Sequence, residues 1–176
     1  YTGNYGLNQG ELTAWHRERW HLLASSGADL LACETIPSFP EALAYLDLLS
    51  ETPETAVWFS FSCRNGAEIS DGTPVEEVVT AVAAHPQVVA IGVNCTAPRY
   101  IPDLIKTMHQ LTKKPIVVYP NSGEAYDAER KEWHGESIPA EFGTFSKEWR
   151  KMGAAIIGGC CRTTPAHIRQ IRDRFR

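Results

Sequence analysis

The run VVAIGVN, residues 88–94, decides the fold class of this 176-residue chain. It is almost continuously apolar and rich in β-branched residues, a pattern typical of a strand buried on both faces of a parallel sheet. Four further runs share this pattern: ADLLACE at 28–34, AVWFSFS at 56–62, PIVVYP at 115–120 and AAIIGG at 154–159. Segments with helical patterns lie between or beside these runs. The sequence therefore predicts repeated right-handed strand–helix units in an α/β fold.

Helix start and stop signals separate the predicted strands. We expect a helix over ELTAWHRERWHLLASSG, residues 11–27, ending at its glycine. Capping boxes are expected where Ser38 precedes Glu41 and in TPVE at 73–76, and the Thr-Pro pair at 164–165 begins the last helix in the same way. The predicted order is one helix followed by five strand–helix units.

Two α/β architectures fit this order, a doubly wound open sheet and a (β/α)8 TIM barrel. No GxGxxG or GxxxxGK[ST] pattern follows any strand, so nucleotide-binding versions of the open sheet lose support. A complete barrel has eight strands and about 250 residues. If the fold is a barrel, these are its C-terminal five βα units, with residues 1–176 in a single domain that needs the N-terminal half of the barrel.

The composition excludes several functional classes. With 43% hydrophobic and 22% charged residues, the chain is typical of a globular protein. It has no apolar run near the roughly 18 residues of a membrane span, and its first residues lack a secretory pattern, so the default expectation is a cytoplasmic protein. A net charge of -4 argues against nucleic-acid binding, and the arginines of HIRQIRDRFR at 167–176 are expected on a solvated helix face.

Unusual side chains lie at three of the five predicted strand ends. Glu34 ends the first strand, Cys95 follows the third, and Cys160 with Cys161 follows the fifth. Ligands bind at the carboxyl ends of strands in α/β proteins. Counted back from the last strand of a barrel, these are strands 4, 6 and 8, and alternate strands fill the same layer of the barrel interior. The side chains are therefore expected to converge.

Three interpretations of these cysteines remain open. Three thiolates with one open position suit Zn²⁺, but free cysteine also commonly packs as an inert core residue, and neighbouring thiols can form a redox pair. Because successive strand residues face opposite sides, Cys160 and Cys161 can bind one ion only where the strand has ended. Gly158 and Gly159 are expected to provide that freedom, through backbone conformations that other residues avoid.

The other cysteines and the six histidines are expected to be structural. Cys33 and Cys63 are interpreted as buried fillers, with Cys33 pointing away from the side that Glu34 faces. His16 and His21 are five residues apart, which does not place them on one helix face.

Four motifs together resemble a known family: GADLLACETIP at 27–37, GVNC at 92–95, VVYPNSGEAYD at 117–127 and IGGCCRTTPAHI at 157–168. They are similar to the zinc-dependent homocysteine S-methyltransferases, and most similar to the members that use S-methylmethionine. The resemblance implies a (β/α)8 barrel. It also implies a first strand with an Asp-Gly segment that completes the homocysteine pocket, and nothing in this sequence matches that segment.

The resemblance also implies roles for single residues. It places Zn²⁺ on Cys95, Cys160 and Cys161, the amino group of homocysteine on Glu34, and Asn94 in the same pocket. Since a free thiol titrates near pH 8.5 and metal coordination deprotonates it, the homocysteine sulfur is expected to take the fourth zinc position. There it would attack the methyl group of a sulfonium donor and give methionine.

The methyl donor and its site are less defined. S-methylmethionine is the first expectation, with S-adenosylmethionine as a second sulfonium. Betaine or a methylfolate in the same barrel, and a non-catalytic fragment with a structural zinc, are the alternatives. A sulfonium cation favours aromatic faces, and Tyr119, Tyr126 and Trp133 lie in one long connection. These aromatic residues either bind the donor or pack the loop against the barrel.

Overall fold

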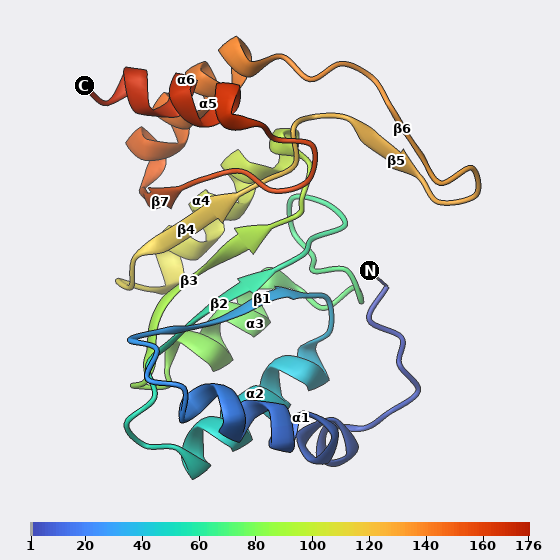
Figure 1. Ribbon diagram of the computed structural model, residues 1–176, viewed down its shortest axis with the longest axis vertical. Coiled ribbons are helices and arrows are strands. Elements are labelled where there is room, and N and C mark those ends of the chain that lie inside the picture. The colour runs from blue at the N-terminus through green and yellow to red at the C-terminus, as the bar shows by residue number, and fades with distance from the viewer. Residues whose placement is uncertain (1) are drawn as a thin grey trace.

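Five parallel strands form one sheet in the computed structural model, which describes residues 2–176. The sheet order is β1-β2-β3-β4-β7, so each strand lies beside its predecessor among the five (Figure 1). The strands are β1 (Leu31–Ile36), β2 (Val57–Phe61), β3 (Val88–Asn94), β4 (Ile116–Tyr119) and β7 (Ala154–Ile157). The predicted parallel α/β architecture is confirmed.

The strand bounds agree best where most residues of the strand are buried, as in β3. β3 has the predicted bounds, whereas β1 begins three residues after the predicted start at Ala28. Residues 28–30 are exposed, and pairing with β2 begins at Leu31, which lies opposite Val57. Apolar character alone therefore placed the start of this strand too early.

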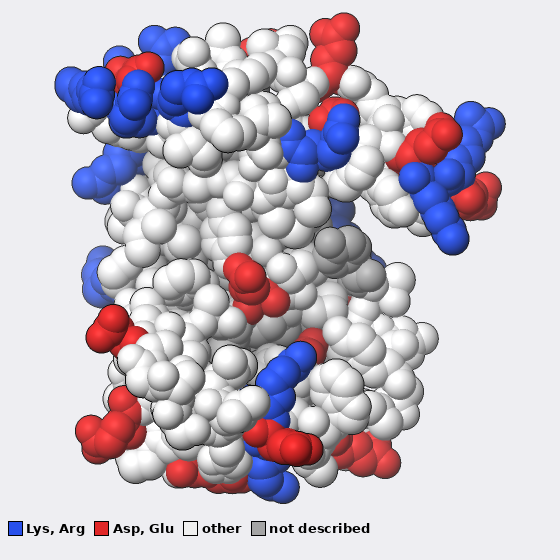
Figure 2. All heavy atoms as spheres, in the orientation of Figure 1, with Lys and Arg blue, Asp and Glu red and all other residues white. Residues whose placement is uncertain are grey.

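Six α-helices and one short 3-10 helix connect the strands within the described residues. They are α1 (Gln9–Ala24), α2 (Phe39–Glu51), α3 (Val75–Ala83), η1 (Pro98–Tyr100), α4 (Ile101–Leu111), α5 (Pro139–Met152) and α6 (Pro165–Arg174). The arginines of α6 and the residues after it are exposed, as expected, and Lys and Arg side chains gather at this end of the molecule in Figure 2. No helix within residues 2–176 is long and apolar enough to cross a membrane.

The first helix begins earlier than predicted because Asn8 caps it. Asn8 Oδ1 accepts from the backbone N–H of Glu11 at 3.0 Å, and Glu11 Oε2 accepts from the N–H of Asn8 at 2.8 Å. This reciprocal capping box satisfies two N–H groups that would otherwise lack partners. The helix therefore begins at Gln9, two residues before the predicted start.

Two predicted capping boxes are wrong. The Ser38 side chain makes no capping bond. The Glu41 carboxylate does not complete the box either, because it contacts His16 Nε2 at 3.0 Å and accepts from Tyr5 Oη at 3.0 Å. The box at 73–76 is also absent: Pro74 is the N-cap of α3 and no side chain caps that end. The last helix does begin with Pro165, and Thr164 forms a capping box with His167.

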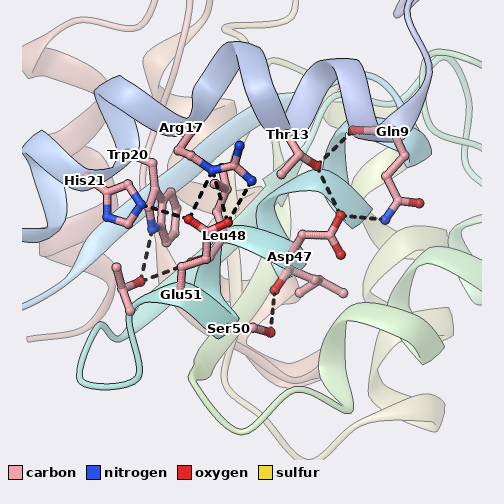
Figure 3. A network of polar contacts seen from close by, with 11 residues as sticks. Gln9, Thr13, Arg17, Trp20, His21, Asp47, Leu48, Ser50 and Glu51 are labelled. Atoms are coloured by element: carbon pink, nitrogen blue, oxygen red, sulfur yellow. Dashed lines mark hydrogen bonds and ion pairs between the residues drawn. The ribbon is translucent and has the colours of Figure 1, made fainter.

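A polar network joins α1 to α2 (Figure 3). Asp47 Oδ2 accepts from Gln9 Nε2 at 2.8 Å and from Thr13 Oγ1 at 3.1 Å. One turn further along, Arg17 Nη2 donates to Glu51 Oε1 at 2.9 Å. Exposed ion pairs of this kind contribute about 0.2–1 kcal/mol each. Their main effect is therefore to fix how the first helix lies on the second.

The two faces of the sheet differ in what covers them. Cys33, Phe59 and Ile91 are buried in the core, whereas Glu34 is exposed and Ile156 is 48% exposed. In Figure 1 the sheet lies in front of α3 and α4 and no helix covers its near face, which is largely free of charge in Figure 2. Cys33 and Glu34 therefore face opposite ways, as expected.

A small antiparallel hairpin, which the sequence did not predict, projects from the connection after β4. Its strands are β5 (Ala125–Asp127) and β6 (Glu132–His134), and they pair with each other. Figure 1 shows the hairpin extending away from the sheet, between β4 and α5.

Candidate metal centre and substrate pocket

Cys95 turns out of the sheet at the end of β3. It is the first residue after the strand, and its φ of 46° lies in the left-handed region that residues with side chains rarely adopt. Its backbone N–H donates to the carbonyl of Tyr119 at 3.3 Å, so β4 fixes the position of the turn. Strain of this kind persists where the surrounding structure enforces it, and it clusters at functional sites.

The loop after β7 brings the other two cysteines to the same place. The Cys160 N–H donates to the carbonyl of Pro120 at 2.8 Å, and the Cys161 carbonyl accepts from the N–H of Ser122 at 3.0 Å. Thr163 Oγ1 closes the loop by donating to the carbonyl of Cys160 at 2.7 Å. The segment after β4 therefore holds both cysteines by their backbone.

The expected role of the two glycines is wrong. Neither Gly158 nor Gly159 adopts a left-handed conformation; Arg162 does, with φ 65°. Gly159 is required for space, because an added Cβ would lie 2.6 Å from Thr163 Oγ1.

The three sulfur atoms form one compact group. All three lie within 4.8 Å of one another, and Cys95 Sγ is 3.7 Å from Cys161 Sγ. Two sulfur ligands at about 2.3 Å from a tetrahedral zinc are about 3.8 Å apart, so the donor set suits this ion. Cys95 Sγ and Cys160 Sγ are in direct contact, and both must be free thiolates to bind metal. Among residues 2–176 no other His, Cys, Asp or Glu side chains cluster in this way.

The remaining cysteines lie outside this group. Burial raises the pKa of the Cys33 thiol, which is 6% exposed, to about 12. Burial likewise raises the pKa of Cys63 to about 12, although this residue also lines the cavity described below. Both thiols therefore stay protonated at neutral pH.

Glu34 lies on the open face of β1 and is joined to Tyr119. Tyr119 Oη donates to Glu34 Oε2 at 3.0 Å, across 85 residues of sequence. Burial, with a smaller contribution from the Glu34 carboxylate, raises the pKa of Tyr119 to about 12. The phenol therefore remains a hydrogen-bond donor at neutral pH, and Tyr119 is a hydrogen-bond partner of Glu34.

Asn94 holds the strand end beside Glu34. Its Oδ1 accepts from the Thr35 N–H at 2.9 Å and from Ser60 Oγ at 2.7 Å, while its Nδ2 donates to Thr35 Oγ1 at 2.6 Å. Thr35 has a φ of 60°, which is strained for a β-branched residue. Asn94 Nδ2 also lies 4.0 Å from Cys160 Sγ. The Asn94 side chain therefore lies beside the cysteines, and its amide oxygen already accepts hydrogen bonds from residues of β1 and β2.

A cavity of about 870 Å³ opens beside the sulfur group. Cys95 and Cys161 line one part of it, and Tyr126 and Trp133 of the hairpin line another. The rings of Tyr126 and Trp133 are 5.1 Å apart between centroids, and Tyr126 is 50% exposed. Of the three aromatic residues predicted for the donor site, these two face the cavity with the cysteines, and Tyr119 is not among its lining residues.

An ion pair, which sequence reasoning missed, ties the hairpin to the cysteine loop. Arg162 Nη2 lies 3.2 Å from Glu124 Oε1, and Ser122 Oγ donates to Glu124 Oε2 at 2.8 Å. These contacts hold the pKa of Glu124 below its usual value, chiefly through Arg162. The position of Arg162 directly after the paired cysteines was the available signal. At the other root of the hairpin, Ser137 Oγ lies 2.9 Å from His167 Nε2.

These features define a class first: a parallel α/β domain with a three-cysteine cluster, suited to hold a metal ion, at the carboxyl ends of its strands. The chain belongs to the homocysteine S-methyltransferase family, whose profile, described as "Homocysteine S-methyltransferase", matches residues 1–175.

Two similar proteins, one of them solved in two forms, illustrate this membership. "Homocysteine S-methyltransferase YbgG" of Bacillus subtilis is 48% identical over 171 residues, which are 97% of this chain and 54% of the relative. The solved structure of the oxidized form of the Escherichia coli homocysteine methyltransferase MmuM matches with a TM-score of 0.85 and 42% identity, over 99% of this chain and 55% of that one. The metallated form of MmuM matches with a TM-score of 0.84 and 41% identity, over the same shares. The chain spans about half the length of the relatives it matches.

Proposed function

We propose that the protein containing this chain transfers a methyl group from a sulfonium donor to the thiol of homocysteine, giving methionine. S-methylmethionine is the preferred donor of this proposal and S-adenosylmethionine the second. The observation that carries it is the convergence of Cys95, Cys160 and Cys161, with sulfur atoms within 4.8 Å of one another, in a chain of this family.

The proposed fold of that protein is a (β/α)8 barrel, with residues 1–176 as the C-terminal five βα units of its single domain. A doubly wound sheet carries helices on both faces, but one face of this sheet is uncovered. The uncovered face and the coverage of about half of each relative support an N-terminal half that closes the barrel. The same half would complete the homocysteine pocket.

The proposed metal is Zn²⁺, held by Cys95, Cys160 and Cys161 as thiolates. When bound, it keeps one position for the substrate thiol and lowers the pKa of that thiol, so that the thiolate forms at neutral pH. Three cysteine thiolates leave the centre with a net negative charge. The substrate sulfur therefore keeps more nucleophilic character than it would beside neutral ligands.

The chain's own residues bind and orient the substrates. Glu34 is proposed to bind the ammonium group of homocysteine, with its carboxylate held by Tyr119 Oη. Asn94 acts as a positioning residue, because it holds Thr35 in a strained conformation next to Glu34. Tyr126 and Trp133 present aromatic faces, which attract the cationic sulfonium group.

Methyl transfer then needs no general base on the protein. The homocysteine sulfur forms a bond to the methyl carbon as the bond from that carbon to the donor sulfonium breaks, and the electron pair of the broken bond returns to the donor sulfur. The thiol proton has already left to solvent. Transfer from S-methylmethionine thus yields two molecules of methionine.

The test combines metal content with substrate protection in the complete protein, after reduction. We expect one zinc per chain, protection of the site thiols from alkylation by homocysteine, and loss of both zinc and methyl transfer in Cys160→Ala. Cys33→Ala is the matched control. Because this buried thiol lies outside the cysteine cluster, the variant protein should keep its zinc. Full methyl transfer without zinc would refute the mechanism, and zinc without protection would favour a non-catalytic structural site.

The donor is tested separately, by supplying S-methylmethionine, S-adenosylmethionine, betaine or a methylfolate with homocysteine. Transfer from betaine or the folate alone would replace the proposed sulfonium donor.

A further inference from the structure

The cavity beside the cysteines is lined by two arginines that the proposed function does not use. Arg64 and Arg99 line the same cavity as Cys95, Tyr126 and Trp133. Two arginines lining a cavity that is proposed to take a cation need a separate explanation.

The two arginines differ in how they are neutralised. Arg64 donates to Glu68 Oε2 through Nη2 at 2.7 Å and through Nε at 2.9 Å, so its charge is compensated. Arg99 donates to Tyr100 Oη at 3.2 Å, and its Cζ lies 4.6 Å from the centroid of the Tyr100 ring. Within residues 2–176 no carboxylate lies within ion-pair distance of Arg99. Its positive charge is therefore available to a ligand.

The one carboxylate that lines the cavity cannot serve Arg99, because it is already engaged. Glu124 is bound by Arg162 and by Ser122, and its side chain is 7% exposed. The cavity thus has an uncompensated cation at Arg99 and aromatic faces at Tyr126 and Trp133. This arrangement complements a ligand with a carboxylate at one end and a cationic group at the other.

The position of Arg99 suits such a role. It lies in η1, which follows the left-handed turn at Cys95 within a few residues, so the strand end that carries Cys95 also places the guanidinium. A planar guanidinium binds a carboxylate through two parallel hydrogen bonds, which fix the orientation of the ligand as well as adding affinity.

We propose that Arg99 binds the carboxylate of the methyl donor, so that the cavity selects amino-acid sulfonium donors over simple sulfonium ions. This inference rests on the proposed function and names the donor class that the same site accepts. Binding of the carboxylate at Arg99 would leave the sulfonium end for the aromatic pair and the sulfur group. Arg99 would then contribute to orientation for methyl transfer.

The test is a cycle of two donors and two proteins, measured in the complete reduced, zinc-loaded protein. The donors are S-methylmethionine and its decarboxylated analogue, an aminopropyl dimethylsulfonium ion, and the variant is Arg99→Met. We expect kcat/KM for S-methylmethionine to fall about 10- to 100-fold in the variant, as for a lost charged hydrogen bond. For the decarboxylated donor we expect a change of less than about twofold.

Controls separate binding from folding. Arg99→Lys keeps the charge and should retain part of the selectivity, and Arg169→Met removes an exposed arginine of α6 and should change neither donor. Zinc content and the KM for homocysteine should be unchanged in Arg99→Met. Equal losses for both donors, or no loss for either, would overturn the assignment of Arg99. Wild-type protein that transfers from neither sulfonium would overturn the proposed function and this inference with it.

Discussion

Replacing Asn94 by alanine should destabilise the protein more than the loss of so small a side chain suggests. Asn94 is 1% exposed and makes three hydrogen bonds, two to Thr35 and one to Ser60. At about 1 kcal/mol for each bond, the free energy of unfolding should fall by about 3 kcal/mol. The reason is that the Thr35 N–H and the Ser60 hydroxyl would lose their partner at a strand end where Asn94 and Ser60 are buried from water.

A matched asparagine provides the control. Asn65 also makes three side-chain hydrogen bonds, to Ala67 and Glu68, but in a partly exposed loop where water can replace them. Asn65→Ala should therefore lower the free energy of unfolding by about 1 kcal/mol or less. Urea unfolding followed by circular dichroism measures both differences, provided that the slope against denaturant is unchanged.

A second substitution tests the strain directly. Thr35 has a φ of 60°, which glycine adopts freely. In the Asn94→Ala background, Thr35→Gly should therefore recover about 1 kcal/mol, whereas in the wild type it also removes a bond to Asn94. The reasoning is refuted if Asn94→Ala costs no more than Asn65→Ala, or if glycine recovers nothing.

Three further perturbations test the surroundings of the sulfur group. Glu124→Gln should raise the KM for the donor several-fold and leave zinc content unchanged, because it weakens the Arg162 contact that anchors the hairpin; an unchanged KM would count against that anchor. Gly159→Ala should lower zinc affinity in a metal-competition titration, because its Cβ would collide with Thr163; unaltered affinity would show that the loop has room. At pH 8, iodoacetamide should modify the three site thiols of the reduced, metal-free protein and spare Cys33, whose pKa of about 12 keeps it protonated; mass spectrometry that finds Cys33 modified first would contradict this.

The sequence predicted the elements that depend on patterns within a short stretch of residues. β3 is continuously apolar and has the predicted bounds, and the cysteines that follow β3 and β7 meet because parallel strands end at the same edge. Side-chain alternation also predicted correctly that Cys33 and Glu34 face opposite ways. Helix caps were less predictable: Ser38 has the right neighbour in Glu41, but Tyr5 and His16 bind that carboxylate instead.

The polar contacts of the pocket depend on sheet register, which local patterns do not contain. Asn94 lies opposite Tyr119 in the ladder of β3 and β4, and its partner Thr35 is 59 residues away in sequence. Tyr119 stands near the end of its apolar run, so the sequence associates it with the loop aromatics, yet as the last residue of β4 it contacts Glu34. The hairpin was missed because its three-residue strands are mostly exposed and carry no apolar pattern.

The hairpin has a consequence for how substrate choice can change. Its two strands pair only with each other within the described residues, and it enters and leaves the fold between β4 and α5. Its length and its aromatic residues can therefore vary without shifting the register of any sheet strand. Residues 125–134 thus form an exchangeable module: replacing them as a block should alter which donor is accepted while the cysteine scaffold stays intact.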